Sequence, residues 1–219
     1  SAKNLFDATT PQTTMFIDLG HSSYSVSVVD FVTGKLTVKS TAFDRSLGGR
    51  EFDMAIAKWL GEEFAAKYKC ANPFDSPKPW MKLQQAAEKA KKSLSPAGVT
   101  EASMFIECLA EDRDFSISLK GDKFEELVAP LLARLTPPIA AALEEAGVTK
   151  EQLSAVEIVG GGTRANSVKK TISGFLGLDQ SKVNYGLGTT MNADEAVSKG
   201  CALAAAMLST RFKVKEFAV

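Results

Sequence analysis

Length, composition and charge describe an ordinary globular protein. The chain has 219 residues, 45% of them hydrophobic, and its 26 basic and 26 acidic residues cancel. A chain of this length buries roughly 70% of its unfolded surface, enough for a real core. The charge balance gives no support to nucleic-acid binding. No apolar run approaches the ~18 residues of a membrane span, so neither nucleic acid nor a membrane is an expected partner.

The cysteines and the single histidine argue against a metal or disulfide framework. Cys70, Cys108 and Cys201 lie far apart and form no C-x-x-C motif, and His21 is the only histidine. This pattern disfavours zinc and disulfides and favours a reducing compartment, so we expect a cytoplasmic protein.

The first part of the chain predicts three antiparallel strands. Residues 1–11 are expected to be a leader or linker, and residues 14–45 carry "TMFIDLG", "YSVSVVDF" and "KLTVKSTAFD". The first segment is mostly apolar, as in a buried strand, and the other two alternate. The turn "DLGHSSYS" between the first two leaves three interpretations open: a phosphate loop, a catalytic loop without its acid, or a plain hairpin.

Two helices are predicted next. After "LGGRE", apolar side chains recur at helical spacing from Phe52 to Tyr68. A proline-rich loop then precedes a helix over about Trp80–Ser95. Its apolar stripe lies on one side, and a polar group faces another way: Glu88, Lys91, Lys92 and Ser95. This polar face is either solvated surface or a binding surface.

The remainder predicts a hairpin and further helices. Residues 102–120 read as a hairpin with "AEDRD" at its tip, and Asp122 with Glu125 predicts a capping box for the next helix. Three prolines, Pro130, Pro137 and Pro138, should kink or divide that helical run. A strand entering "VGGGTRA" and a small-residue helix over 192–209 complete the pattern, which predicts an α/β fold with a mixed sheet.

The glycine-rich turn is ambiguous by itself. Gly160, Gly162 and Ala165 match the dinucleotide fingerprint G-x-G-x-x-A. That motif requires an acid at the end of the next strand, and only Asp179 lies near that distance, in a polar loop. A tight strand-to-helix turn without a ligand is the other interpretation.

The order of these motifs carries more information than any one of them. A D-L-G hairpin, L-G-G, an E-x-x-K-K-x-x-S helix, G-G-G-T-R and N-A-D-E-A-V follow one another over residues 14–210. This order resembles lobe II of the nucleotide-binding domain of the 70-kDa heat-shock chaperone superfamily, which shares its fold with actin and hexokinase. "GHSSYSVSV", "TAFDRSLGGREFD" and "FKVKEF" resemble its large, 110-kDa branch.

The resemblance implies an organisation in two subdomains and an origin in a longer protein. The base would comprise 12–46 and 128–210, and an inserted α+β subdomain would comprise 47–127. Residues 211–219 would begin a link to a missing substrate-binding domain. The start at Ser1 and the strand-like ending "FKVKEFAV" also suggest an excised piece.

The resemblance also implies a half-site for ATP or ADP. Asp18 would reach Mg²⁺ through water, and Ser25 replaces a second acid that ordinary chaperones use in hydrolysis. The implied nucleotide-binding residues are Asp18, Gly20, Ser23, Gly48, Gly49, Glu88, Lys91, Lys92, Ser95, Gly161, Gly162, Arg164 and Asp194. Because nothing in this chain matches the other lobe, we expect weak or no nucleotide binding, no catalytic residue and no measurable hydrolysis here.

For the whole protein, the resemblance implies a co-chaperone. It would bind ATP and act as a nucleotide-exchange factor for 70-kDa chaperones, and the resemblance also implies that it holds unfolded clients. The alternative is an ATP-hydrolysing folding chaperone of the 70-kDa type, and a dinucleotide-dependent oxidoreductase is a third class. His21 is expected to be an exposed turn residue without a catalytic role.

Overall fold

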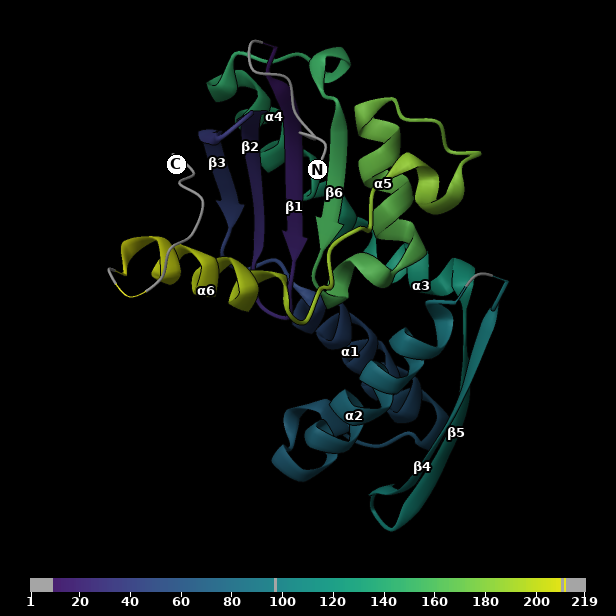
Figure 1. Ribbon diagram of the computed structural model, residues 1–219. Coiled ribbons are helices and arrows are strands. Elements are labelled where there is room, and N and C mark those ends of the chain that lie inside the picture. The colour runs from purple at the N-terminus through teal and green to yellow at the C-terminus, as the bar shows by residue number, and fades with distance from the viewer. Residues whose placement is uncertain (1–9, 97, 210, 212–219) are drawn as a thin grey trace.

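A four-stranded mixed sheet forms the upper part of the molecule (Figure 1). The structure, a computed structural model, describes residues 10–96, 98–209 and 211. The strands lie in the order β3–β2–β1–β6, with bounds β1 (Gln12–Leu19), β2 (Tyr24–Val32), β3 (Lys35–Asp44) and β6 (Ala155–Val159). Strand β1 pairs antiparallel with β2 and parallel with β6, so the predicted mixed sheet is confirmed.

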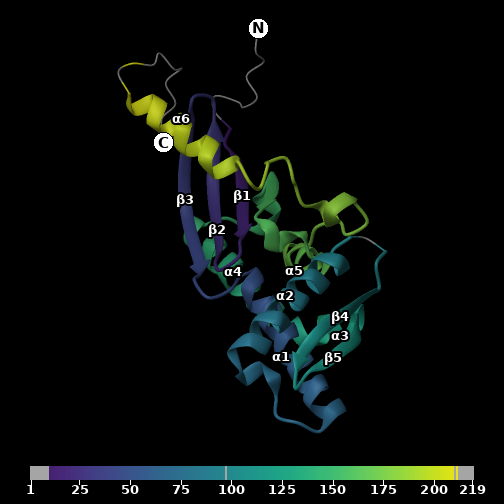
Figure 2. The ribbon, with the colours of Figure 1, turned by 90° about the horizontal axis from the view of Figure 1, so that it is seen from below.

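Buried and half-buried side chains alternate along β1, which shows which face of the sheet is covered. Met15, Ile17 and Leu19 are fully buried, while Phe16 and Asp18 on the other face are only half-buried. The buried face packs against α4 (Thr136–Ala146), in which Ile139 is fully buried. Helix α5 (Asn166–Leu176) lies on the side of β1 away from β3 (Figures 1 and 2).

A second group of elements lies below the sheet (Figure 1). It consists of α1 (Gly49–Tyr68), η1 (Pro73–Asp75), α2 (Pro77–Leu94), β4 (Glu101–Ala110) and β5 (Arg113–Lys120). Helices α1 and α2 pack against each other, and α2 packs on β4. The grouping corresponds to the predicted base and inserted subdomain, whose boundaries at 47 and 127 stay predictions.

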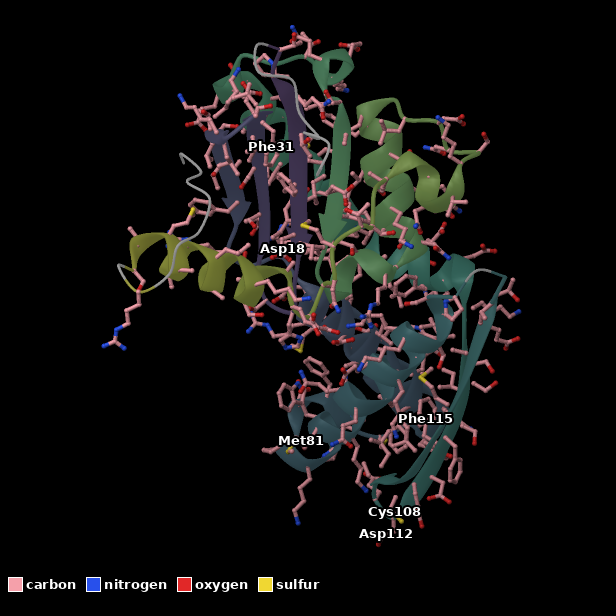
Figure 3. The ribbon with its side chains drawn as sticks, viewed as in Figure 1. Asp18, Phe31, Met81, Cys108, Asp112 and Phe115 are labelled. Carbon is pink, nitrogen blue, oxygen red and sulfur yellow. The ribbon has the colours of Figure 1, made fainter. Side chains whose placement is uncertain are left out.

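The long helices follow their apolar periodicity. In α1 the side chains of Phe52, Ile56, Leu60 and Phe64 are buried, as their spacing predicts. The hairpin β4–β5 turns at Glu111 and Asp112, which both have positive φ, and Asp112 lies at the far tip in Figure 3. The predicted hairpin and the two predicted helices are therefore confirmed, but α2 begins at Pro77, inside the predicted proline-rich loop.

Some predicted helix ends are wrong. Helix α3 (Gly121–Ala133) begins one residue before Asp122, and its N-cap position is Lys120 without a side-chain cap, so Asp122 and Glu125 form no capping box. The backbone N–H of Gly121 instead donates to the carbonyl oxygen of Thr100. Pro130 lies inside α3 without ending it, and the break comes at 134–135, before α4.

The run from α3 through α4 corrects a second prediction. Within the described residues, Gly121–Ala146 is long and apolar enough to cross a membrane by length and composition. Val128, Leu135 and Ile139 of this run are nevertheless fully buried in the protein core. Packing in the core thus accounts for part of the apolar character of this run.

The last described helix stands apart from the core. Helix α6 (Ala196–Leu208) has no buried residue, and Val197, Leu203 and Leu208 are exposed. It was predicted to start at 192, but Asn192 accepts hydrogen bonds from the backbone N–H groups of Glu195 and Ala196, which makes a turn first. The predicted leader and the strand-like "FKVKEF" lie almost wholly outside the described residues.

Candidate functional site

The hairpin between β1 and β2 caps the N-terminus of α1. The N–H of Gly49 donates to the carbonyl oxygen of Gly20 at 2.9 Å, and that of Arg50 donates to the carbonyl oxygen of His21 at 2.8 Å. A Cβ on Gly48 would lie 2.4 Å from the His21 oxygen, so only glycine fits there. The turn "LGG" thus joins the sheet to α1 by close backbone contact.

The glycine-rich turn after β6 packs on the end of β1. A Cβ on Gly160 would lie 2.4 Å from the carbonyl oxygen of Leu19, and Gly160 also has φ of +90°. A Cβ on Gly162 would lie 2.7 Å from Leu19 Cγ, whereas a Cβ on Gly161 would meet nothing within 4 Å. The turn forms η3 (Gly161–Arg164) before α5 begins, so it does not open the helix directly as predicted. Two of its glycines therefore serve packing, and Gly161 faces open space.

Both lysines on the polar face of α2 are paired with carboxylates. Lys91 Nζ lies 2.7 Å from Asp53 Oδ1 and donates to the carbonyl oxygen of Gly49 at 3.0 Å. Lys92 Nζ lies 2.6 Å from Glu88 Oε1, one helical turn away, and this hydrogen bond holds the pKa of Glu88 below its usual value. The polar face is thus nearly neutral.

The β1–β2 hairpin with the start of α1, the glycine-rich turn and the polar face of α2 surround a cavity of about 540 Å³. This size is typical of sites for small ligands. Nine of the thirteen residues predicted to bind nucleotide line it: Gly20, Gly49, Glu88, Lys91, Lys92, Ser95, Gly161, Gly162 and Arg164. The cavity lies where the sheet, α1, α2 and the glycine-rich turn meet. Their role in binding stays a prediction, but segments far apart in sequence do converge.

Four further lining residues were missed by the sequence interpretation: His21, Phe52, Pro96 and Ala165. Phe52 is 2% exposed and contributes an apolar wall. Its position three residues after Gly49 on the buried stripe of α1 was an available signal. His21 is exposed, as predicted, but it stands at the cavity edge.

The other four predicted residues lie outside the cavity wall. Gly48 is buried against the hairpin, while Ser23 and Asp194 are exposed in turns. Asp18 lies at the lower end of β1, above the junction with α1 (Figure 3). None of these four residues lines the cavity, so their roles in binding stay predictions.

Asp18 and Ser25 oppose each other across β1 and β2. Burial raises the pKa of the Asp18 carboxyl, and Gly160 lies close beside it. Among the residues that the structure describes, no cluster of three or more His, Cys, Asp and Glu could hold a metal ion. One carboxylate and one hydroxyl suit a Mg²⁺ ion that keeps its water and takes its other ligands from phosphates.

Most of the charged side chains around the cavity are paired with one another, and apolar groups share the lining. Two ion pairs neutralise the acids and lysines around it, and Arg164 makes no ion pair with the residues described here. Phe52, Pro96 and Ala165 supply apolar surface for a ring. A nucleoside with its sugar hydroxyls matches this lining, and Arg164 keeps its positive charge available to an anionic group of the ligand.

Comparison with known proteins agrees with this geometry. A family model described as Hsp70 protein matches residues 2–219. The chain is 46% identical over 209 residues to heat shock 70 kDa protein 4 of Canis lupus familiaris, covering 95% of this chain and 24% of that protein. It is 44% identical to human heat shock 70 kDa protein 4L, with the same coverages.

A fungal relative extends the comparison. The chain is 43% identical over 209 residues to heat shock protein hsp88 of Neurospora crassa, covering 95% of this chain and 28% of that protein. The chain thus spans about a quarter of the length of these relatives. The match over nearly its whole length shows that this chain belongs to the large branch of the Hsp70 family and has the fold of an actin-like ATPase lobe.

Proposed function

We propose that this chain is lobe II of a nucleotide-binding domain and that its cavity holds the adenosine end of ATP or ADP. The carrying observation is the cavity itself, in which the β1–β2 hairpin, α2 and the Gly161–Arg164 turn meet around a charge-paired, partly apolar space. Membership of the Hsp70 family supports nucleotide as the ligand.

The proposed site is only half of a complete one. The lining residues offer contacts for a base and a sugar, whereas Asp18 lies beyond the wall, where phosphates with Mg²⁺ would extend. Mg²⁺ would supply charge neutralisation of the phosphates, and Asp18 would orient water toward it. We therefore expect the isolated chain to bind nucleotide weakly and to hydrolyse none measurably.

For the whole protein we propose a co-chaperone role. It would bind ATP as a conformational ligand and accelerate nucleotide release from 70-kDa heat-shock chaperones in the cytoplasm, and it would also hold unfolded clients. Ser25 supports this role over active turnover, because the residue opposite Asp18 carries a hydroxyl that cannot act as a carboxylate does.

The alternative is a folding chaperone driven by its own ATP hydrolysis. The two are separated by measuring, for the full-length protein, steady-state ATP turnover and the release of a fluorescent ADP from a 70-kDa partner. Accelerated release with negligible turnover is expected. Turnover that falls on Asp18→Ala, without any acceleration of release, would support the alternative and contradict the exchange role.

A further inference from the structure

The Lys91 ammonium group is held by two fixed acceptors. Its Nζ lies 2.7 Å from Asp53 Oδ1 and 3.0 Å from the carbonyl oxygen of Gly49. A lysine ammonium carries three N–H donors in a tetrahedral arrangement. Lys91 also lines the cavity, so its ammonium group is within reach of a ligand there.

Both members of this pair are sheltered from water. Asp53 is 6% exposed and the Lys91 side chain 16% exposed. Burial raises the pKa of Asp53, while the hydrogen bond and charge of Lys91 oppose that rise; Glu88 raises it further and His21 lowers it. A buried carboxylate without its cation is costly, so the pair holds both side chains in place.

The pair also sets the charge that a ligand meets. Asp53 cancels the charge of Lys91, and Glu88 lies in an ion pair with Lys92. A neutralised ammonium still donates a hydrogen bond well, but it attracts a polyanion weakly. The Lys91 ammonium group is therefore better suited to a hydroxyl than to a phosphate.

We propose that Asp53 is a positioning residue that fixes Lys91 for a sugar hydroxyl and biases the cavity toward the nucleoside end of the nucleotide. Asp53 does not line the cavity, so it acts through Lys91. The inference rests on the proposed nucleotide site and deepens it. It assigns to this carboxylate both the orientation of the Lys91 ammonium group and a weaker attraction of that group for phosphate.

Two substitutions separate geometry from charge. Asp53→Asn keeps an oxygen acceptor for Lys91 but removes the negative charge, whereas Asp53→Ala removes both. Asp30→Asn is the matched control, because Asp30 also pairs with a lysine, Lys39, but on the sheet away from the cavity. Adenosine and inorganic tripolyphosphate are titrated separately into each protein and followed by NMR.

The expected results differ between the two ligands. Asp53→Ala should weaken adenosine binding by about tenfold, the loss of one charge-assisted contact. Asp53→Asn should leave adenosine binding within about threefold and strengthen tripolyphosphate binding by about tenfold. An unchanged ratio of the two affinities in Asp53→Asn would overturn the inference. If Asp53→Ala does not fold, the Asp53→Asn ratio still decides.

A ligand-free measurement separates this inference from the nucleotide site itself. The ¹⁵Nζ signal of Lys91 should be protected from solvent exchange in the wild-type chain and should shift in Asp53→Asn but not in Asp30→Asn. A signal indifferent to Asp53→Asn would overturn the positioning role, whatever adenosine does. A wild-type chain that binds no adenosine, with Lys91 still dependent on Asp53, would overturn the nucleotide site and uphold the pairing.

Discussion

The Arg134 guanidinium group donates hydrogen bonds to both carboxylate oxygens of Asp44. Its Nη2 lies 2.8 Å from Oδ1 and 2.7 Å from Oδ2, its Nε donates to Oδ2 at 3.0 Å, and Nη2 also donates to Ser46 Oγ. The contact ties the break between α3 and α4 to the end of β3, just before the turn that carries Gly48 and Gly49. It therefore fixes the chain where it leaves the sheet for α1.

This pair should make stability depend on acid pH. Burial alone would raise the pKa of Asp44, but the N–H of Ser46 and the Arg134 guanidinium outweigh it, and the pKa lies below the ordinary 3.8. A lowered pKa in the folded state means that the stabilisation is present above pH 3.8 and is lost as the pH falls below that value.

The test is Arg134→Gln in urea unfolding. Because the Arg134 side chain is 38% exposed, we expect a loss of only about 1 kcal/mol at pH 7. The variant should also lose less free energy of unfolding than the wild type between pH 4 and pH 2. Lys123→Gln, which breaks an exposed pair with Glu126, is the control. Parallel acid profiles for Arg134→Gln and wild type would contradict the assignment.

Neighbouring glycines in the turn after β6 should respond differently to alanine. Gly160→Ala introduces strain at φ +90° and a clash with the Leu19 carbonyl, so it should cost about 3 kcal/mol of unfolding free energy or prevent folding. Gly161→Ala meets nothing within 4 Å, so its stability should stay within about 0.5 kcal/mol. Equal effects on chemical denaturation would show that the turn is not packed as described.

Two lysines on α2 provide a matched pair for binding. Lys92 lines the proposed site, whereas Lys89 lines a separate cavity between α2 and β4. Lys92→Ala should weaken adenosine binding about threefold to tenfold, while Lys89→Ala should leave it unchanged. Both residues are exposed, so neither change should move the melting temperature appreciably. Adenosine affinity that falls equally in both variants would place the ligand elsewhere.

A side-chain hydrogen bond links α5 to the end of α2. Asn166 Nδ2 donates to the carbonyl oxygen of Ser95 at 3.3 Å, beside the cavity. Asn166→Ala should speed hydrogen–deuterium exchange in residues 92–96 at a stability cost of about 1 kcal/mol or less. Asn192→Ala, in an exposed turn before α6, should leave that exchange unaltered. If exchange is also unaltered in Asn166→Ala, the hydrogen bond from Asn166 to Ser95 does not stabilise residues 92–96.

The sequence predicted those helices whose residue spacing alone identifies them. The apolar spacing from Phe52 to Phe64 and the polar face from Glu88 to Ser95 predicted α1 and the chemistry of α2. The capping box at Asp122 failed because a tertiary hydrogen bond, from Gly121 to Thr100, begins the helix one residue earlier. Helix ends depend on such contacts, which short sequence windows do not contain.

The site required the order of the motifs as well as their content. Gly160 and Gly161 are indistinguishable in sequence, and only the path of β1 beside β6 makes the first a packing residue and the second a cavity residue. Asp53 carried no motif signal, because its partner Lys91 lies 38 positions away on another helix. Long-range pairing therefore accounts for most of what the sequence interpretation missed.

The central claim is that adenosine binds in the cavity between the β1–β2 hairpin, α2 and the glycine-rich turn. It is tested most directly by titrating adenosine into the ¹⁵N-labelled chain and recording backbone amide shifts. Saturable shifts are predicted at Gly20, Lys92, Gly161 and Gly162, with none at the β4–β5 tip around Asp112. No saturable shift up to the solubility limit of adenosine, or shifts confined to another surface, would contradict the claim.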